Sequence, residues 1–242
     1  MDILPQPWAD NPVIAHRGAW KKKGLPENSI ASLQEAVRLG CAGSEFDVHL
    51  TKDNIIVVNH DPIFSGHDIA SSTYAELLAT KLSNGESIPT AEAYLTEGMK
   101  QRSTRLVYEI KASAAGKERT LELTRRSVAL VKSLGAAEWV DYISFDYDAC
   151  KLVHELDPAA RVSYLSGDKS PEQLKTDGLS GFDYHFSVLD KEPGWLSAAR
   201  SLKLSTNAWT VNDPVIMKKL LDQQIDYITT NEPEKLFELL KK

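Results

Sequence analysis

The chain has 242 residues, of which 42% are hydrophobic and 26% are charged, a composition typical of globular proteins. The 28 lysines and arginines against 34 aspartates and glutamates give a formal net charge of −6. This acidic balance argues against a nucleic-acid-binding protein, which usually presents a basic surface. No apolar run approaches the ~20 residues that span a bilayer, so we expect neither a membrane span nor a nucleic-acid partner.

The N-terminal residues show neither the basic nor the apolar stretch of a signal peptide. Two cysteines, Cys41 and Cys150, are too few for a disulfide framework, and we expect both to be buried as small hydrophobic side chains. These features predict a soluble protein but leave its compartment open, because a trimmed leader would fit a periplasmic protein as well as a cytoplasmic one. A monomer and a simple homo-oligomer both fit the sequence.

The first predicted elements are a short apolar strand at residues 13–15 and an amphipathic helix over residues 28–39. Residues 45–50 then alternate with a period of two, and residues 54–58 form a second β-rich run. The few residues between these runs cannot hold a parallel crossover, so the pair must be an antiparallel hairpin. Pairing outward from its turn places His60 across from Glu45 or close to it.

From about residue 105, strand-like runs alternate with helical patterns, as in βα units on a parallel sheet. The expected strands cover residues 106–110, 142–145, 161–165, 182–186, 204–209 and 226–229, and the expected helices cover residues 117–134, 148–156, 171–177, 195–201, 214–223 and 233–240. With the strands near residues 13 and 44, these make eight parallel strands. We therefore predict an α/β protein with a single (β/α)8 TIM barrel domain over residues 1–242. Residues 51–104 lack the alternation and predict a short insertion after the second strand, beginning with the hairpin.

Active sites of (β/α)8 barrels lie at the C-terminal ends of the strands. The polar residues expected there are His16, Arg17, Glu45, Asp47, Glu109 and Lys111, with His60 brought back by the hairpin. Carboxylates suit a hard divalent cation such as Mg²⁺ or Ca²⁺, histidines suit proton transfer near neutral pH, and Arg and Lys suit a phosphate. Together these groups predict metal-assisted hydrolysis of a phosphate ester.

A series of motifs in this order resembles the glycerophosphodiester phosphodiesterase family along nearly the whole chain. The motifs are His16-Arg17-Gly18, Pro26-Glu27-Asn28-Ser29, Glu45-Phe46-Asp47-Val48, Thr51-Lys52-Asp53, His60-Asp61, Glu109-Ile110-Lys111, Ser144-Phe145, Trp209-Thr210-Val211-Asn212 and Thr229-Thr230-Asn231. The resemblance implies a (β/α)8 barrel enzyme that hydrolyses small-molecule glycerophosphodiesters to sn-glycerol 3-phosphate and an alcohol.

The same resemblance implies a role for each residue of the expected site. His16 and His60 would be the general acid/base pair, and Glu45, Asp47 and Glu109 would bind one divalent cation, Mg²⁺ or Ca²⁺. Arg17 and Lys111 would hold the phosphate, and Trp209 would form an apolar wall against the glycerol or the head group. The sequence does not decide which histidine is the acid, or whether water or a substrate hydroxyl attacks phosphorus.

Three departures from the family pattern bear on these expectations. Ser29 stands where the family usually has Thr, and Asn54 replaces a turn Gly, a change that Asn tolerates. Residues 62–68 are shorter than the polar segment that usually follows His-Asp, which leaves the cover over the alcohol and the head-group preference open.

Several alternatives stay open at this point. The three carboxylates could pair with Arg17 and Lys111 and bind no metal, although two bases would leave negative charge that a cation would relieve. Asp61 is expected to anchor His60 rather than bind metal. The chain could instead be a lysophospholipase-D-like or other phosphodiesterase of the same superfamily, or a non-catalytic barrel that binds a polyol phosphate.

Overall fold

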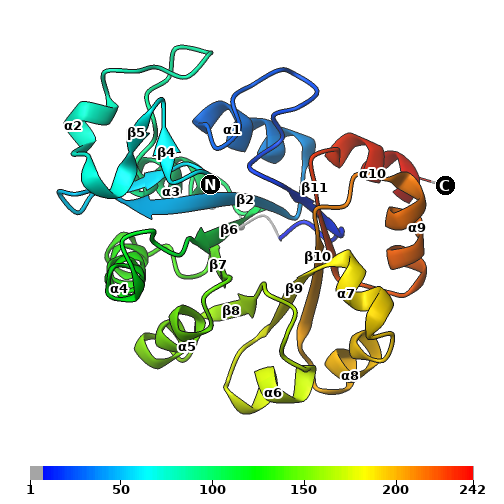
Figure 1. Cartoon of the computed structure of the whole chain (residues 1–242). Coiled ribbons are helices and arrows are strands. Elements are labelled where there is room, and N and C mark those ends of the chain that lie inside the picture. The colour runs from blue at the N-terminus through cyan, green and yellow to red at the C-terminus, as the bar shows by residue number, and fades with distance from the viewer. Residues whose placement is uncertain (1–7, 242) are drawn as a thin grey trace, which may run out of the picture.

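Within residues 8–241, which the computed structural model describes, eight strands pair in parallel around a closed ring (Figure 1). They are β1 (Val13–Ala15), β2 (Gly43–Leu50), β6 (Arg105–Ile110), β7 (Val140–Ser144), β8 (Arg161–Tyr164), β9 (Gly181–His185), β10 (Ser205–Trp209) and β11 (Tyr227–Thr230). The ring closes because β1 pairs with both β2 and β11. The structure is a (β/α)8 TIM barrel, and the eight expected strands are confirmed.

Helices cover the outside of the ring (Figure 1). They are α1 (Ile30–Leu39), α3 (Ala91–Gly98), α4 (Lys117–Leu134), α5 (Tyr147–Leu156), α6 (Pro171–Thr176), α7 (Phe186–Lys191), α8 (Trp195–Ser201), α9 (Pro214–Asp222) and α10 (Pro233–Leu240). The seven expected helices are all present, with bounds that differ by at most two residues. We did not expect α7, because it follows β9 without an intervening turn residue and its apolar start extends the pattern of the strand.

The antiparallel hairpin after β2 is confirmed. β3 (Ile56–Val58) pairs with β2 in a register that places Val58 opposite Val48 and Ile56 opposite Leu50. The backbone N–H of Asn59 then donates to the carbonyl of Asp47 at 3.0 Å. This pairing brings the next residue, His60, back to the mouth of the barrel.

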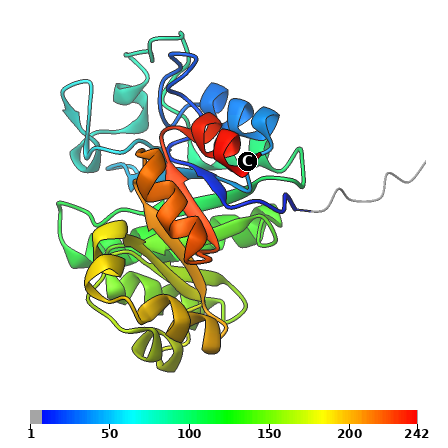
Figure 2. The same ribbon diagram turned by 90° about the vertical axis from the view of Figure 1, so that its right-hand side faces the viewer.

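The stretch that follows the hairpin contains β4 (Ile63–Phe64), β5 (His67–Asp68), a 3-10 helix η1 (Ile69–Ser71) and α2 (Tyr74–Leu77). A small core of its own, separate from the main core, consists of Val57, Phe64, Ile69, Leu77 and Ile88. In the side view of Figure 2 this part (cyan) lies at the end of the barrel opposite the start of the described chain (dark blue). The last part of the predicted insertion, α3, instead packs between α1 and α4 on the barrel wall.

The alternation of side chains along the strands separates a packed outer face from the lumen. On β2, Phe46 points outward, where its ring stacks on Tyr94 of α3 at 4.2 Å between centroids and meets Tyr108 at 4.9 Å. Glu45 and Asp47 have the opposite orientation. Apolar side chains fill part of the lumen, namely Ile14, Ala42, Val107, Ile143 and Leu165. Polar groups therefore gather at the C-terminal ends of the strands.

Cys41 and Cys150 are both buried and unbonded to each other, as expected. Burial raises the pKa of each thiol, so both stay protonated at neutral pH. Within residues 8–241, no helix has both the length and the apolar character that crossing a membrane would require.

Candidate active site

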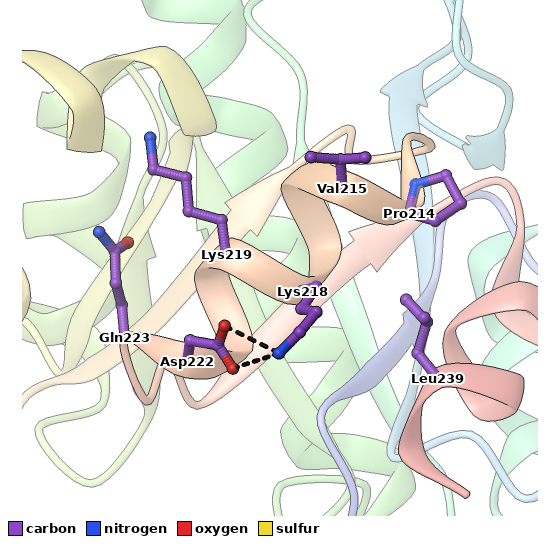
Figure 3. A pocket seen from close by; sticks show the side chains of 7 residues that line it. All are labelled: Pro214, Val215, Lys218, Lys219, Asp222, Gln223 and Leu239. Atoms are coloured by element: carbon purple, nitrogen blue, oxygen red, sulfur yellow. Dashed lines mark hydrogen bonds and ion pairs between the residues drawn. The ribbon is translucent and has the colours of Figure 1, made fainter. Parts of the chain in front are cut away.

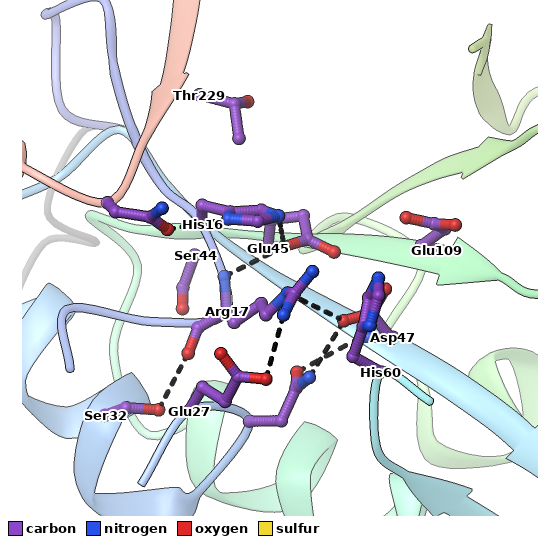
Figure 4. A network of polar contacts seen from close by, with 12 residues as sticks. His16, Arg17, Glu27, Ser32, Ser44, Glu45, Asp47, His60, Glu109 and Thr229 are labelled. Atoms are coloured by element: carbon purple, nitrogen blue, oxygen red, sulfur yellow. Dashed lines mark hydrogen bonds and ion pairs between the residues drawn. The ribbon is translucent and has the colours of Figure 1, made fainter. Parts of the chain in front are cut away.

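The predicted site residues converge on one pocket of about 120 Å³ at the mouth of the barrel. Its lining includes His16, Arg17, Glu45, His60, Glu109, Lys111 and Trp209. Asp47 does not line the pocket but lies directly beside it, because Lys111 Nζ is 3.3 Å from Asp47 Oδ1. Figure 4 shows the polar network around Arg17, with Glu45 and Asp47 on β2 and Glu109 on the neighbouring β6.

Three buried carboxylates form the negative part of this network. Glu45, Asp47 and Glu109 each offer an oxygen within 4.8 Å of those of the other two, and each residue is 7% exposed or less. Burial, followed by the charges of Asp47 and Glu109, raises the pKa of Glu45 well above its usual range. Burial and the charge of Asp47 likewise raise the pKa of Glu109 to about 7. Both shifts express the cost of holding three like charges together away from water.

Asp47 keeps its negative charge. Burial opposes ionisation, but the Lys111 ammonium, His60 and the Asn28 amide together lower the pKa of Asp47 below its usual value. Asn28 binds it twice: Asn28 Nδ2 donates to Asp47 Oδ2 at 2.8 Å, and the Asp47 backbone N–H donates to Asn28 Oδ1 at 3.2 Å.

Lys111 and Arg17 do not neutralise the cluster fully. Lys111 Nζ lies 2.8 Å from Glu109 Oε1, but Arg17 Nη1 donates to Glu27 at 2.8 Å, and its Nε is 3.7 Å from Asp47. The Arg17 backbone N–H donates to Glu45 Oε2 at 2.9 Å, whereas Glu45 Oε1 is buried without a hydrogen-bond partner. An unpartnered buried carboxylate oxygen beside two more carboxylates is a donor set that fits a hard divalent cation.

His16 is held in one orientation at the end of β1. Its Nδ1 lies 2.7 Å from Asn231 Oδ1; with the amide in this orientation Nδ1 carries the proton and Nε2 is a free acceptor. The Asn231 backbone N–H in turn donates to Asn212 Oδ1 at 2.8 Å. Burial, followed by the charge of Arg17, lowers the pKa of His16 to about 4. The imidazole is therefore neutral near pH 7.

His60 has a different environment. Its Nδ1 lies 2.7 Å from Asp61 Oδ1, and about a third of its side chain is exposed. Asp61 thus contacts the ring and lies outside the carboxylate cluster, as expected of an anchor. His49, on β2, places Nε2 3.0 Å from the carbonyl oxygen of His60 and so holds this part of the chain.

An aromatic wall closes another part of the pocket. Trp209, at the end of β10, packs edge-on against Phe145 at 5.4 Å and against His185 at 5.1 Å between ring centroids. Its indole N–H donates to the carbonyl of Asp183 at 2.9 Å. Trp209 and Phe145 line the pocket. His185 packs behind Trp209 and its Nδ1 contacts Ser187, so it positions the indole rather than facing the pocket.

Three residues near the pocket were not expected there. Asn28 and Asn231 stood in family motifs without an assigned role in the site, and Asp183 stood inside a strand-like run. The Asn28 backbone is left-handed, with φ of 57°, which carries its amide away from α1 and toward Asp47. That geometry is one that Asn tolerates better than most residues. In the sequence, the signal that could have marked Asn28 was its place in the Pro26-Glu27-Asn28-Ser29 motif.

Gly18 fixes the turn that positions His16 and Arg17. Its φ is +79°, and a Cβ there would lie 2.6 Å from Ser32 Cβ and 2.7 Å from the Ser32 backbone carbon. We expect Gly18→Ala to cost about 2–5 kcal/mol of unfolding free energy through left-handed strain and overpacking. The matched control is Gly24→Ala, also left-handed but with no atom near its Cβ, which should cost only about 1–2 kcal/mol. Urea unfolding measures both; equal losses would contradict the steric account.

The carboxylate cluster also predicts a pH dependence of stability for the metal-free protein. Because the pKa of Glu109 is higher in the folded state, the folded state holds a proton that the unfolded chain has already released between about pH 4.5 and 7. Its contribution to stability therefore falls as pH rises through that window. In urea unfolding with EDTA, the unfolding free energy of Glu109→Gln minus that of the wild type should rise by on the order of 2 kcal/mol from pH 5 to pH 7. A constant difference between the two proteins would contradict the raised pKa.

A larger hollow of about 540 Å³ lies elsewhere, on the outer surface between α9 and α10 (Figure 3). Its lining is Pro214, Val215, Lys218, Lys219, Asp222, Gln223 and Leu239. Lys218 Nζ contacts both carboxylate oxygens of Asp222 at 2.9 Å, which satisfies those charges. This hollow lacks histidine and clustered carboxylates, so the chemistry belongs to the smaller pocket.

The fold and this pocket define a class: a TIM barrel hydrolase of phosphoric diesters. The model of the Glycerophosphoryl diester phosphodiesterase family matches residues 16–235, and the chain belongs to this family. A glycerophosphodiester phosphodiesterase of Caldanaerobacter subterraneus is 26% identical over 95% of this chain and 98% of that protein.

Solved structures agree with this assignment. The crystal structure of a glycerophosphodiester phosphodiesterase from Parabacteroides distasonis is 45% identical, with a TM-score of 0.92 over 97% of this chain and 98% of that one. A phosphodiesterase from Oleispira antarctica, solved in complex with the product sn-glycerol-3-phosphate, is 25% identical with a TM-score of 0.80, over 96% and 97% of the two chains.

Proposed function

We propose that this enzyme hydrolyses glycerophosphodiesters to sn-glycerol 3-phosphate and an alcohol, by metal-dependent catalysis with two histidines as acid and base. The observation that carries the proposal is the convergence of His16, His60 and the three-carboxylate cluster on one small pocket. Its volume of about 120 Å³ suits a glycerol phosphate group better than an acyl chain, which favours glycerophosphodiesters over lysolipids.

The asymmetry of the two histidines supports a division of roles. His16 is neutral with Nε2 unprotonated, so it is placed to accept a proton from the attacking oxygen, either water or a substrate hydroxyl. His60 is more exposed and has Asp61 beside Nδ1, a carboxylate that orients the ring and leaves Nε2 facing away from it. His60 then donates a proton from Nε2 to the leaving alkoxide.

The remaining residues bind and orient the diester. Arg17 and Lys111 hold the anionic phosphate, Arg17 with its planar fork and Lys111 as a point charge. Trp209 packs against the carbon atoms of the glycerol or head group. Glu45, Asp47 and Glu109 would hold one divalent cation, Mg²⁺ or Ca²⁺, which supplies positive charge to stabilise the transition state at phosphorus.

The test is release of sn-glycerol 3-phosphate from glycerophosphocholine and glycerophosphoethanolamine, with EDTA and after restoring Mg²⁺ or Ca²⁺. We expect release that stops with EDTA and returns with the cation. Release that persists after exhaustive chelation would contradict the metal requirement. Release from lysophosphatidylcholine but not from either glycerophosphodiester would favour the lysophospholipase-D-like alternative, and no release from any of the three would favour a binding protein.

A further inference from the structure

Asp183 lies inside the barrel at the base of the pocket, and the reaction described above does not use it. It stands at the centre of β9, where Phe182 and Tyr184 point outward into the main core and Asp183 points into the lumen. It borders both the pocket and a second cavity of about 230 Å³. That cavity extends toward the N-terminal ends of the strands, where Ser163 and Ser205 line it. Asp183 therefore marks the boundary between the pocket and the interior of the barrel.

The carboxyl of Asp183 has unused hydrogen-bonding capacity. The residue is 1% exposed, and its Oδ1 has no hydrogen-bond partner. None of the described Lys, Arg or His side chains lies within ion-pair distance of it, in contrast to Asp47 and Glu109, which both contact Lys111. Burial, followed by the charge of Glu109, raises the pKa of Asp183 well above its usual range. The Asn207 amide opposes this shift. A protonated carboxyl carries an O–H donor as well as acceptors.

A second polar group stands on the same side of the pocket. Thr229, on β11, lines the pocket, and its hydroxyl oxygen accepts a hydrogen bond from Asn207 Nδ2 at 2.9 Å. Asn207 is the register partner of Asp183 on the adjacent strand β10. The Thr229 hydroxyl donates no hydrogen bond within the described residues, so its proton is available to a ligand. The two residues together offer both donors and acceptors, which is the complement of an alcohol group.

The walls above this polar base are apolar. Ile143, Leu165 and Trp209 line the pocket, and Leu165 follows β8 directly beside Asp183 on β9. The charged residues Arg17 and Lys111, which suit a phosphate, lie instead at the C-terminal ends of their strands, next to the carboxylate cluster. The pocket thus runs from an anion site, past an apolar wall, to a hydroxyl site at its base.

We propose that Asp183, together with Thr229, binds the terminal hydroxyl of the substrate's glycerol unit and thereby sets selectivity for it. The inference rests on the proposed function and specifies which residue recognises the glycerol. A hydroxyl two carbons away from the phosphate-bearing carbon reaches past the apolar wall, whereas the carbon chain contacts Ile143, Leu165 and Trp209. A ligand without that hydroxyl would leave the buried carboxyl unpaired, which is the arrangement that gives strong discrimination.

The experiment compares glycerophosphocholine with (2-hydroxypropyl)phosphocholine, which lacks only the terminal hydroxyl and keeps the hydroxyl next to the phosphate ester. For the wild type we expect kcat/KM to favour glycerophosphocholine by about 10–100-fold. Asp183→Leu should remove most of this ratio, because the buried carboxyl that the shorter substrate leaves unpaired is gone and only the Thr229 hydroxyl remains. Asp183→Asn should keep most of the ratio, because the amide still donates and accepts.

The same measurements contain the outcomes that overturn the inference. A wild type that cleaves both diesters equally well overturns it, and so does an Asp183→Leu variant that slows on both substrates by the same factor, since that pattern indicates a structural role only. Loss of the ratio in Asp183→Asn as complete as in Asp183→Leu overturns the hydrogen-bond assignment. If Asp183→Leu does not fold, Thr229→Val takes its place, with an expected reduction of the ratio by about threefold to tenfold. A wild type that cleaves neither diester overturns the proposed function itself.

Discussion

Replacing His16 or His60 with Ala is expected to lower kcat by about 10²–10⁴-fold while the barrel stays folded. His16 offers an unprotonated Nε2, and His60 has Asp61 beside its other nitrogen, so each ring is set up for one direction of proton transfer. Steady-state release of sn-glycerol 3-phosphate from glycerophosphocholine, in the presence of Mg²⁺ or Ca²⁺, measures the loss. Near-normal activity in either variant would contradict the two-histidine mechanism.

The matched control is His67→Ala. His67 is exposed on β5, outside the pocket, and we expect this variant to keep full activity. His16→Ala also leaves the amide of Asn231 without its hydrogen-bond partner, which lowers stability. Thermal unfolding of all three variants therefore distinguishes a loss of catalysis from a loss of folding. The double variant His16→Ala/His60→Ala should be little slower than the worse single variant, since residues that act as a unit are not additive. Additive losses would indicate that the two rings act in separate steps.

Much of the candidate site could be predicted because its residues follow rules of local geometry. The hairpin after β2 is too tight for any pairing other than the antiparallel one, so the return of His60 to the mouth of the barrel followed from the short connection alone. The register places His60 nearer Asp47 than across from Glu45. Glu45 and Asp47 share a face through the period of two, as do Glu109 and Lys111. Once eight strands are counted, the C-terminal ends of all of them must meet at one mouth.

The residues that escaped prediction depend on closure of the ring or on backbone conformation. Asp183 alternates with aromatic residues on β9 as any half-buried strand residue would, and only ring closure brings it near enough to Glu109 to feel its charge. Asn231 reaches His16 because β11, the last strand, pairs with β1, the first. The helix α3 was hidden for a different reason: at eight residues ending in Gly98, it is too short for a clear helical period.

Glu45→Gln is expected to abolish metal-dependent activity and, at the same time, to stabilise the metal-free protein. Glu45 Oε2 accepts the Arg17 backbone N–H, a bond that a glutamine oxygen can also accept, so the turn after β1 is preserved. The substitution removes one of three carboxylates that lie within 4.8 Å of one another, and with it the burial cost and the repulsion from Asp47 and Glu109 that raise the pKa of Glu45. We expect a fall in kcat/KM of at least about 10²-fold, from the loss of a charged ligand to the cation.

Calorimetry in EDTA and in excess Mg²⁺ or Ca²⁺ distinguishes a cation site from a cluster of ion pairs. For the wild type, a cation at 100 times its Kd should add about 2.7 kcal/mol to the unfolding free energy, a rise in Tm of roughly 5–10 °C for a chain of this size. In EDTA, Glu45→Gln should have a higher Tm than the wild type, because the repulsion is already relieved. The cation should raise its Tm little, because the ligand set is incomplete. The control Glu92→Gln, at an exposed carboxylate on α3, should show the wild-type response.

If the wild type unfolds at the same temperature with and without cation, and Glu45→Gln loses stability in EDTA, the carboxylates are held by Lys111 and Arg17 alone. If instead the cation raises the Tm of the wild type, and Glu45→Gln is more stable than the wild type in EDTA, the three carboxylates form a cation site.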